Sequence, residues 1–275
     1  MKNILTLTSL ILINACASEK HVETFKSSAF VINHDKVIAY FARDVLPENR
    51  MYEIVDTLNL GIKLVNELIS GSSDWQMYGD EQLTYNFKPG YFVSHATKSG
   101  EINIPVVIYS MYGQSPWLHE TLHILLRSKK GNWWPISLKA FFRMPQWFTE
   151  GMAEYLAMKI SYDHQLPKLD LFDSGGYITV DSICSISLKG ENSKYILNHI
   201  GEPGIMIKLH GKKRYEYAPA FYNCSCSFTK YLTETYGLDI LIKAYSDYQN
   251  EHKTIEELTG KTMKELKAEW LLEIN

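Results

Sequence analysis

The chain has 275 residues, of which 45% are hydrophobic and 21% are charged, and its formal net charge is −3. This length and composition are typical of a globular protein that buries a sizeable core, and they exclude a disordered chain. The near balance of charge leaves no basic footprint for nucleic acid, so we expect no nucleic-acid partner.

The first residues have the pattern of an export signal. Lys2 precedes an apolar run over residues 4–13, which is too short to span a bilayer in the mature protein. Ala15 and Cys16 follow, and this arrangement resembles the signal of bacterial lipoproteins, in which cleavage before the cysteine leaves it lipid-modified. We therefore expect residues 1–15 to be removed. A lipid on Cys16 would anchor the protein to a membrane of the bacterial cell envelope, at the outer membrane, the periplasm or the cell surface. Without the lipid, the same signal predicts a secreted protein.

Strand patterns and one helix occupy the next part of the chain. Residues 30–32 and 37–41 have the composition of short strands around a turn, and the apolar spacing over residues 47–68 predicts a helix. The clearest strand covers residues 102–109, which are rich in β-branched side chains. Because Pro105 has no N–H for a ladder, we expect this strand at an edge of the sheet.

Helical patterns dominate from Ser115 onward. Helices are predicted to begin near Ser115 and Pro145, and three more follow at residues 217–236, 239–249 and 263–273. Gly237 closes the first of these three. The chain therefore has an α+β pattern, with an α+β lobe over about residues 25–114 and a helical lobe over residues 115–275.

Two threonines in the C-terminal part have the spacing of a capping box. Thr254 and Thr262 each precede a glutamate by three residues. Residues 161–212 are harder to assign, and Gly175-Gly176 indicates a turn there.

The cysteines besides Cys16 are Cys184, Cys224 and Cys226. An exported protein can form a disulfide between Cys184 and one of the other two. Cys224 and Cys226 are separated by a single residue, a shorter gap than zinc-binding cysteine pairs usually have. This spacing favours small buried residues on a packed helix over a metal role.

The helix predicted from Ser115 carries two histidines on one face. Residues four apart share a face, so His119 and His123 can bind one zinc ion as neutral imidazoles. Glu120 projects about 100° away, where its carboxylate can take a proton from water on the metal instead of ligating the metal. An ordinary amphipathic helix that happens to carry two histidines would show the same local spacing, so the motif needs support elsewhere.

Support comes from the helix predicted after Pro145. Glu150 and Glu154 lie four apart on one face there, and Trp147 and Gly151 beside them favour a buried face over a solvated acidic one. Two histidines and one glutamate leave the fourth position of a zinc ion open to water, as catalysis requires. The second carboxylate can accept a hydrogen bond from a ligand histidine.

These two segments together resemble a known family. His119-Glu-Thr-Leu-His123, followed by Trp147-Phe-Thr-Glu150-Gly-Met-Ala-Glu154-Tyr, is similar to the gluzincin metallopeptidases. These are the peptidase MA-like catalytic domains of the thermolysin and zinc-aminopeptidase type. Residues 228–237 and 259–270 are similar to later helices of the family, so the resemblance covers roughly residues 100–275. It implies a thermolysin-like α+β fold, with an N-terminal mixed-sheet lobe, a helical C-terminal lobe and an active-site cleft between them.

The resemblance implies a role for each residue that matches the motif. One Zn²⁺ per chain would be bound by His119, His123 and Glu150. Glu120 would be the general base, and Glu154 would hold a ligand histidine from outside the metal. The strand at residues 102–109 would border the cleft and bind an extended peptide by edge pairing.

An oxyanion donor besides zinc is also implied. Tyr222 has the spacing of the tyrosine that supplies it in the aminopeptidase branch, and Tyr217 and His210 are the alternatives. That branch also carries a Gly-x-Met-Glu-Asn motif that grips the N-terminus of the substrate, and no such motif precedes His119. We therefore expect a zinc metallopeptidase, an endopeptidase rather than an aminopeptidase, with a peptide or protein substrate outside the cytoplasm. The alternative is a non-catalytic envelope lipoprotein, for binding or assembly, that retains the fold with or without a structural zinc.

Overall fold

The computed structural model describes residues 25–69, 82–90, 94–97, 100–106, 116–126, 145–166, 175–191, 193–202, 212–247 and 251–275. The predicted signal at residues 1–15 lies outside these residues, as do Cys16, Ser115 and His210. Among the described helices, none combines the length and the apolar character that crossing a bilayer requires.

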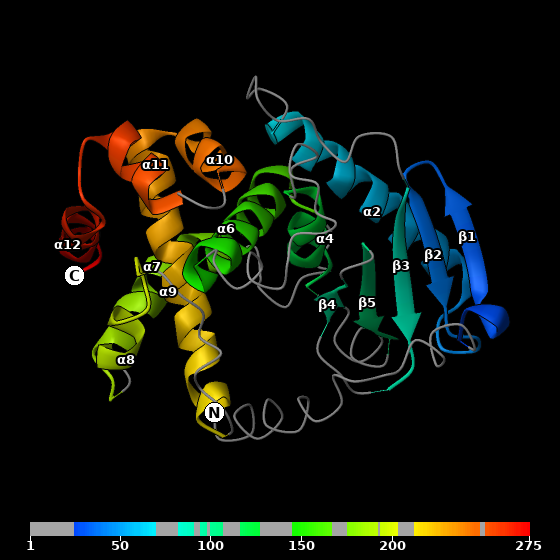
Figure 1. Ribbon diagram of the computed structural model, residues 1–275. Coiled ribbons are helices and arrows are strands. Elements are labelled where there is room, and N and C mark those ends of the chain that lie inside the picture. Colours follow the sequence, from blue (N-terminus) through cyan, green and yellow to red (C-terminus); the bar gives the residue numbers. More distant parts are fainter. Residues whose placement is uncertain are drawn as a thin grey trace.

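A five-stranded mixed sheet occupies one end of the molecule (Figure 1). Its strands lie in the order β1-β2-β3-β5-β4. β2, β3 and β5 are parallel neighbours, whereas β1 and β4 pair antiparallel at the two sides. Their bounds are β1 (Phe30–His34), β2 (Val37–Phe41), β3 (Leu83–Lys88), β4 (His95–Ala96) and β5 (Glu101–Pro105).

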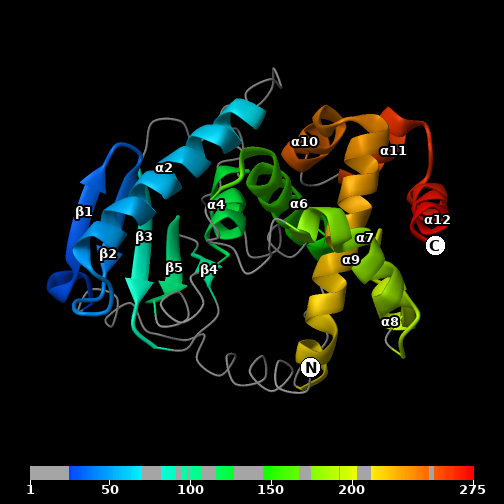
Figure 2. The same ribbon diagram turned by 180° about the vertical axis from the view of Figure 1, so that it is seen from behind.

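Helix α2 (Glu48–Ile69) covers one face of this sheet, and it lies in front of the strands in Figure 2. The helix predicted over residues 47–68 is thereby confirmed. Ile54, Leu58, Ile62 and Val65 form its buried face, at the spacing of successive turns. Alternate strand residues join them in one core, because successive side chains of a strand point to opposite faces.

The prediction that the proline-containing strand forms the edge was wrong. β5 ends at Pro105, and β4 rather than β5 is the outermost strand. β4 pairs only with Ile102 and Asn103, so Pro105 lies beyond the part of β5 that β4 covers. The missing N–H of Pro105 therefore interrupts no ladder on that side. Of the rest of the predicted strand, Val106 is not part of β5, and residues 107–109 lie outside the described residues.

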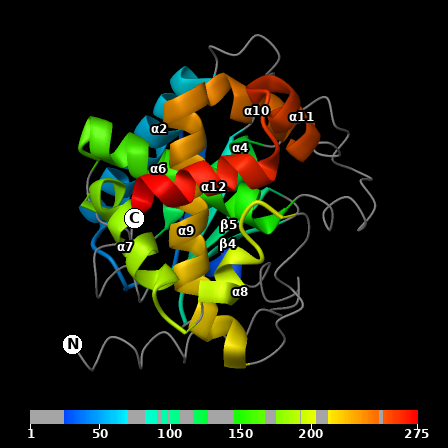
Figure 3. The same ribbon diagram turned by 90° about the vertical axis from the view of Figure 1, so that its left-hand side faces the viewer.

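Every described element after residue 115 is a helix, which completes an α+β fold. α4 lies next to the sheet, α6 packs on α4 (Figure 1), and Figure 3 shows α12 lying across α9. Gly237, with φ of 94°, follows the last residue of α9 as predicted. The bounds are α4 (Trp117–Leu125), α6 (Gln146–His164), α7 (Gly175–Leu188), α8 (Ser193–Leu197), α9 (Lys212–Tyr236), α10 (Leu238–Ser246), α11 (Glu251–Thr259) and α12 (Met263–Ile274).

One of the two predicted capping boxes is confirmed and the other is wrong. The Thr262 hydroxyl accepts a hydrogen bond from the backbone N–H of Glu265, and the Glu265 carboxylate accepts one from the N–H of Thr262. Thr254 lies inside α11, which begins three residues earlier at Glu251, and its hydroxyl donates to Asp247 Oδ2 (2.9 Å). The predicted turn at Gly175 was also wrong, because α7 begins there.

Close packing of α6 on α9 depends on Gly151. A Cβ at this position would lie 2.6 Å from the backbone oxygen of Ser225 and closer still to the hydroxyl of Thr229. Gly151 thus allows the close approach of two helices that its sequence context indicated. A disulfide between Cys184 and Cys224 ties α7 to α9, and Cys226 is a buried free cysteine beside Met158.

Candidate metal centre

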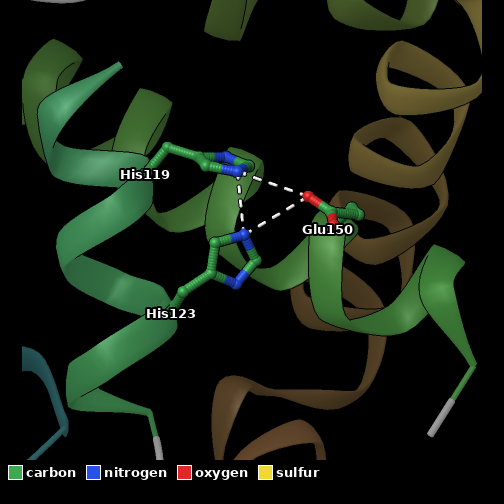
Figure 4. Close-up of side chains that lie close together, drawn as sticks. All are labelled: His119, His123 and Glu150. Atoms are coloured by element: carbon green, nitrogen blue, oxygen red, sulfur yellow. Dashed lines mark hydrogen bonds and ion pairs between the residues drawn. The ribbon is translucent and has the colours of Figure 1, made fainter. Parts of the chain in front are cut away.

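Helices α4 and α6 bring three ligand-type side chains together (Figure 4). His119 Nε2 and His123 Nε2 are 2.9 Å apart, and each lies 3.3 Å from Glu150 Oε2. All three side chains are buried or half-buried. The three predicted ligands therefore form one cluster that could hold a metal ion, although 26 residues lie between His123 and Glu150 in the sequence.

Packing of α4 on the sheet fixes the direction of the two histidines. Leu118, Leu122 and Leu125 are buried on the helix. The hydroxyl of Thr121 lies 2.7 Å from the hydroxyl of Tyr85 on β3, which joins α4 to the sheet inside the core. With this side of α4 buried against the sheet, His119 and His123 face α6.

The spacing of the ligand atoms fits a tetrahedral metal ion. Zinc binds imidazole nitrogen and carboxylate oxygen at about 2.0–2.1 Å, and the edge of such a tetrahedron is about 3.3 Å. The three observed separations, 2.9, 3.3 and 3.3 Å, are close to this edge. Three protein ligands on one face of a tetrahedron leave its fourth corner open.

Glu154 lies beside His119, on the side of the ring away from Glu150, and its predicted role in holding that histidine stays a prediction. Its Oε1 is 3.4 Å from Nδ1 of His119, the ring nitrogen opposite the one that faces Glu150. Glu154 is 4% exposed, and neither its Oε2 nor Nδ1 of His119 has a hydrogen-bond partner among the described residues, so the 3.4 Å contact is an ion pair without a hydrogen bond. A carboxylate at Nδ1 keeps the proton of a neutral imidazole on that nitrogen and leaves Nε2 free to bind a metal.

The electrostatics of the cluster favour a positive charge at its centre. Burial alone would lower the pKa of His119. The nearby carboxylates of Glu154, Glu150 and Glu120 outweigh this effect and raise the pKa to about 10. Burial also opposes the charge of Glu150, yet the two histidines hold its pKa well below the usual range. Burial raises the pKa of Glu154 to about 7. The charge of His119 opposes this increase, and the negative charges of Glu150 and Glu120 add to it. In the metal-free protein a proton on His119 supplies this positive charge, and a bound divalent cation can supply it instead.

Comparison of the chain with models of protein families, with curated proteins and with solved structures finds no match.

Glu120, the predicted base, is held by the outermost strand of the sheet. Its Oε2 accepts a hydrogen bond from the backbone N–H of Ala96 on β4 (2.7 Å). Thr97 N donates to Glu101 O, and hydrogen-bonded and non-bonded pairs alternate along an antiparallel ladder. Ala96 is therefore at a non-bonded position opposite Ile102, and its N–H points away from β5, towards α4. Glu120 is only 7% exposed.

The structure gives neighbours of two of the three predicted oxyanion donors. Tyr222 is half-buried on α9, with its ring centroid 6.0 Å from that of Phe221. Tyr217 stacks on Tyr195 of α8 at a centroid distance of 4.7 Å. His210 lies outside the described residues. The role of Tyr222 stays a prediction.

Ala96 is the residue of this site that sequence reasoning missed. Its contribution is a backbone N–H, which no side-chain pattern reveals, and it stands on a strand of two residues that shows no periodicity. The Thr121–Tyr85 contact was missed for a related reason, because 36 positions separate the two residues in the chain.

Proposed function

We propose that the protein is a zinc-dependent metallopeptidase of the gluzincin type that hydrolyses peptide bonds outside the cytoplasm. The observation that carries the proposal is the meeting of His119, His123 and Glu150 with Glu120 held beside them. One cluster thus combines three side chains that could hold a metal ion and a carboxylate beside them that is bonded elsewhere, and three such ligands would leave a fourth position for water. Under this proposal the two lobes form a thermolysin-like cleft, and Cys16 carries the lipid that anchors the protein in the cell envelope.

Zinc is the metal that this ligand set suits best. Two imidazoles and one carboxylate with a fourth position open are the ligands of a catalytic zinc ion, whereas calcium and magnesium prefer sites made of oxygen alone. Zinc bound here would polarise the scissile carbonyl and lower the pKa of water. His119, oriented by Glu154, and His123 would hold the ion through Nε2.

Glu120 would move the proton. Its carboxylate follows His119 directly on α4 and is largely shielded from solvent, so it can accept a proton from the attacking water and pass it to the leaving amine. The oxyanion would be stabilised by the metal together with a tyrosine, for which Tyr222 is the first candidate. The peptide pairing predicted for the strand at residues 102–109 is not part of this proposal, because β5 has neighbours on both sides and the outward N–H of Ala96 on β4 is bonded to Glu120.

Metal analysis combined with peptide cleavage tests the proposal. Purified protein should contain one zinc per chain and cleave members of a peptide library at internal bonds. Glu120→Gln should keep the zinc and lose cleavage, because the amide cannot accept the proton, whereas His123→Ala should lose the zinc. Wild-type protein that retains zinc and cleaves no peptide would refute the enzyme and favour a binding or assembly protein with a structural zinc.

A further inference from the structure

The strand that holds Glu120 has few attachments of its own. β4 consists of His95 and Ala96, and it pairs only with Asn103 and Ile102 of β5. Just beyond it, Thr97 N donates to Glu101 O, and Thr97 O and Oγ1 accept from the N–H groups of Gly100 and Glu101, so the end next to Ala96 is fixed by the turn, whereas the His95 end depends on fewer bonds. So short a strand at the side of a sheet is weakly held by ladder bonds alone. The position of the Ala96 N–H, and with it that of the Glu120 carboxylate, therefore depends on other contacts of β4.

A row of polar side chains supplies such a contact. Asn86, Asn103 and His95 are register neighbours on β3, β5 and β4. Nδ2 of Asn86 donates to Oδ1 of Asn103 (3.3 Å), and Nδ2 of Asn103 lies 3.2 Å from Nε2 of His95. Because Oδ1 of Asn103 is the acceptor for Asn86, its Nδ2 is the donor to His95. The lone pair on Nε2 of His95 receives this bond, and its ring proton is on Nδ1.

The side-chain amides of Asn86 and Asn103 are buried in the sheet. Asn86 is 0% and Asn103 4% exposed. Asn86 also donates to Glu101, whose carboxylate is held by Lys26 (2.6 Å), and Oδ1 of Asn86 remains without a partner among the described residues. A buried amide with an unpaired oxygen costs free energy compared with an apolar side chain. This row of side chains therefore contributes less to the stability of the sheet than apolar side chains would. What it adds is a directed hydrogen bond to β4.

We infer that Asn103 is a positioning residue for Glu120. It holds His95, and through His95 the whole of β4, where the outward N–H of Ala96 reaches the carboxylate of Glu120. Asn86 orients the amide of Asn103 from the opposite side. Glu120 is the base only under the function proposed above, and the inference rests on that proposal to this extent. The restraint itself requires neither metal nor substrate.

Amide hydrogen exchange measures the restraint directly in the protein freed of metal. In the wild type the Ala96 N–H should exchange slowly, and Glu120→Ala should speed it at least tenfold by removing the acceptor. Asn103→Leu, which keeps the side-chain size and removes the bond to His95, should speed it by a similar factor. Thr84→Val is the matched control, because it removes a hydroxyl from the neighbouring strand β3 in register with Glu101 and should leave Ala96 unchanged.

Peptide hydrolysis tests the consequence for Glu120. Asn103→Leu should lower kcat about tenfold, with KM and zinc content unchanged, because Asn103 is buried behind β4 and substrate does not reach it. His95 is exposed, so substitutions there leave the core intact if Asn103→Leu fails to fold. His95→Leu should reproduce the loss, and His95→Gln, which keeps an acceptor near the place of Nε2, should restore most of it.

Several results would overturn the inference. Unchanged Ala96 exchange in Asn103→Leu would do so, and so would equal kcat in His95→Leu and His95→Gln. Faster exchange throughout the sheet, or loss of zinc from these variants, would show a structural role only. A wild-type protein that binds no zinc and cleaves no peptide would refute the proposed function, while Ala96 exchange would still decide whether Asn103 holds β4.

Discussion

Replacing Gly151 with alanine should separate α6 from α9 and disturb the metal cluster. The new Cβ would lie 2.6 Å from the backbone oxygen of Ser225, and a tolerable contact of 3.0–3.4 Å requires the helices to recede by about 0.4–0.8 Å. The carbonyl belongs to the backbone of α9 and cannot rotate away as a side chain would. Glu150 precedes Gly151 directly, so the ligand moves with the helix. Metal ligands tolerate displacements of only about 0.2 Å before binding weakens.

Two opposing terms set the change in stability. Alanine favours a helix over glycine by about 1 kcal/mol, whereas overpacking a buried contact costs about 1–3 kcal/mol. The contact here involves backbone, so we expect the upper part of that range and a net loss of about 1–2 kcal/mol. In a chain of this size such a loss lowers Tm by roughly 2–8 °C. Zinc affinity should fall at least tenfold, through displacement of Glu150.

Thermal unfolding of the metal-free protein and zinc titration against a competing chelator measure the two effects. Gly190→Ala on the exposed side of the molecule is the control, because its Cβ would meet the Ser187 oxygen at 3.3 Å and needs a shift of only about 0.1 Å. If Gly151→Ala matched the control in both Tm and zinc affinity, the close approach of α6 and α9 at this point would be refuted.

Three further predictions concern the metal and the disulfide. The pKa of His119 is raised to about 10 in the metal-free protein, so zinc must displace its proton. Zinc affinity should rise about tenfold per pH unit between pH 6 and 8, and calorimetry in buffers of different ionisation enthalpy should detect the released proton; affinity independent of pH would contradict this. Glu154→Gln should weaken zinc binding about 10–100-fold, measured by chelator competition, because the amide orients Nδ1 of His119 less strongly than the carboxylate does; equal affinity would show that Glu154 does not hold His119. Cys184→Ser removes a crosslink between residues 40 positions apart and should cost about 4 kcal/mol in denaturant unfolding, whereas reductant should then have no further effect on the variant. A wild-type protein equally stable with and without reductant would show that this disulfide does not contribute.

The sequence alone was sufficient where the signal is local. The histidines four apart on α4 and the glutamates four apart on α6 share faces of their helices whatever the rest of the chain does, so the group that could hold a metal ion could be named in advance. The periodicity of α2 and the capping box at Thr262 are local in the same sense. The helix α7 was missed because its exposed side carries Ile178, Ile183 and Ile186, which obscure the apolar period of 3.6.

Only the tertiary structure decided how these pieces meet. The pairing of β4 with β5 decides which strand lies outermost. Together with the position of α4 beside these strands, it also brings the N–H of Ala96 to Glu120. The pairing of Cys184 with Cys224 rather than Cys226 likewise follows from the faces that α7 and α9 present to each other. Spacing along a helix is set by the backbone of a few neighbouring residues. Contacts between elements are set by how the whole core packs, and no short segment of the sequence contains that information.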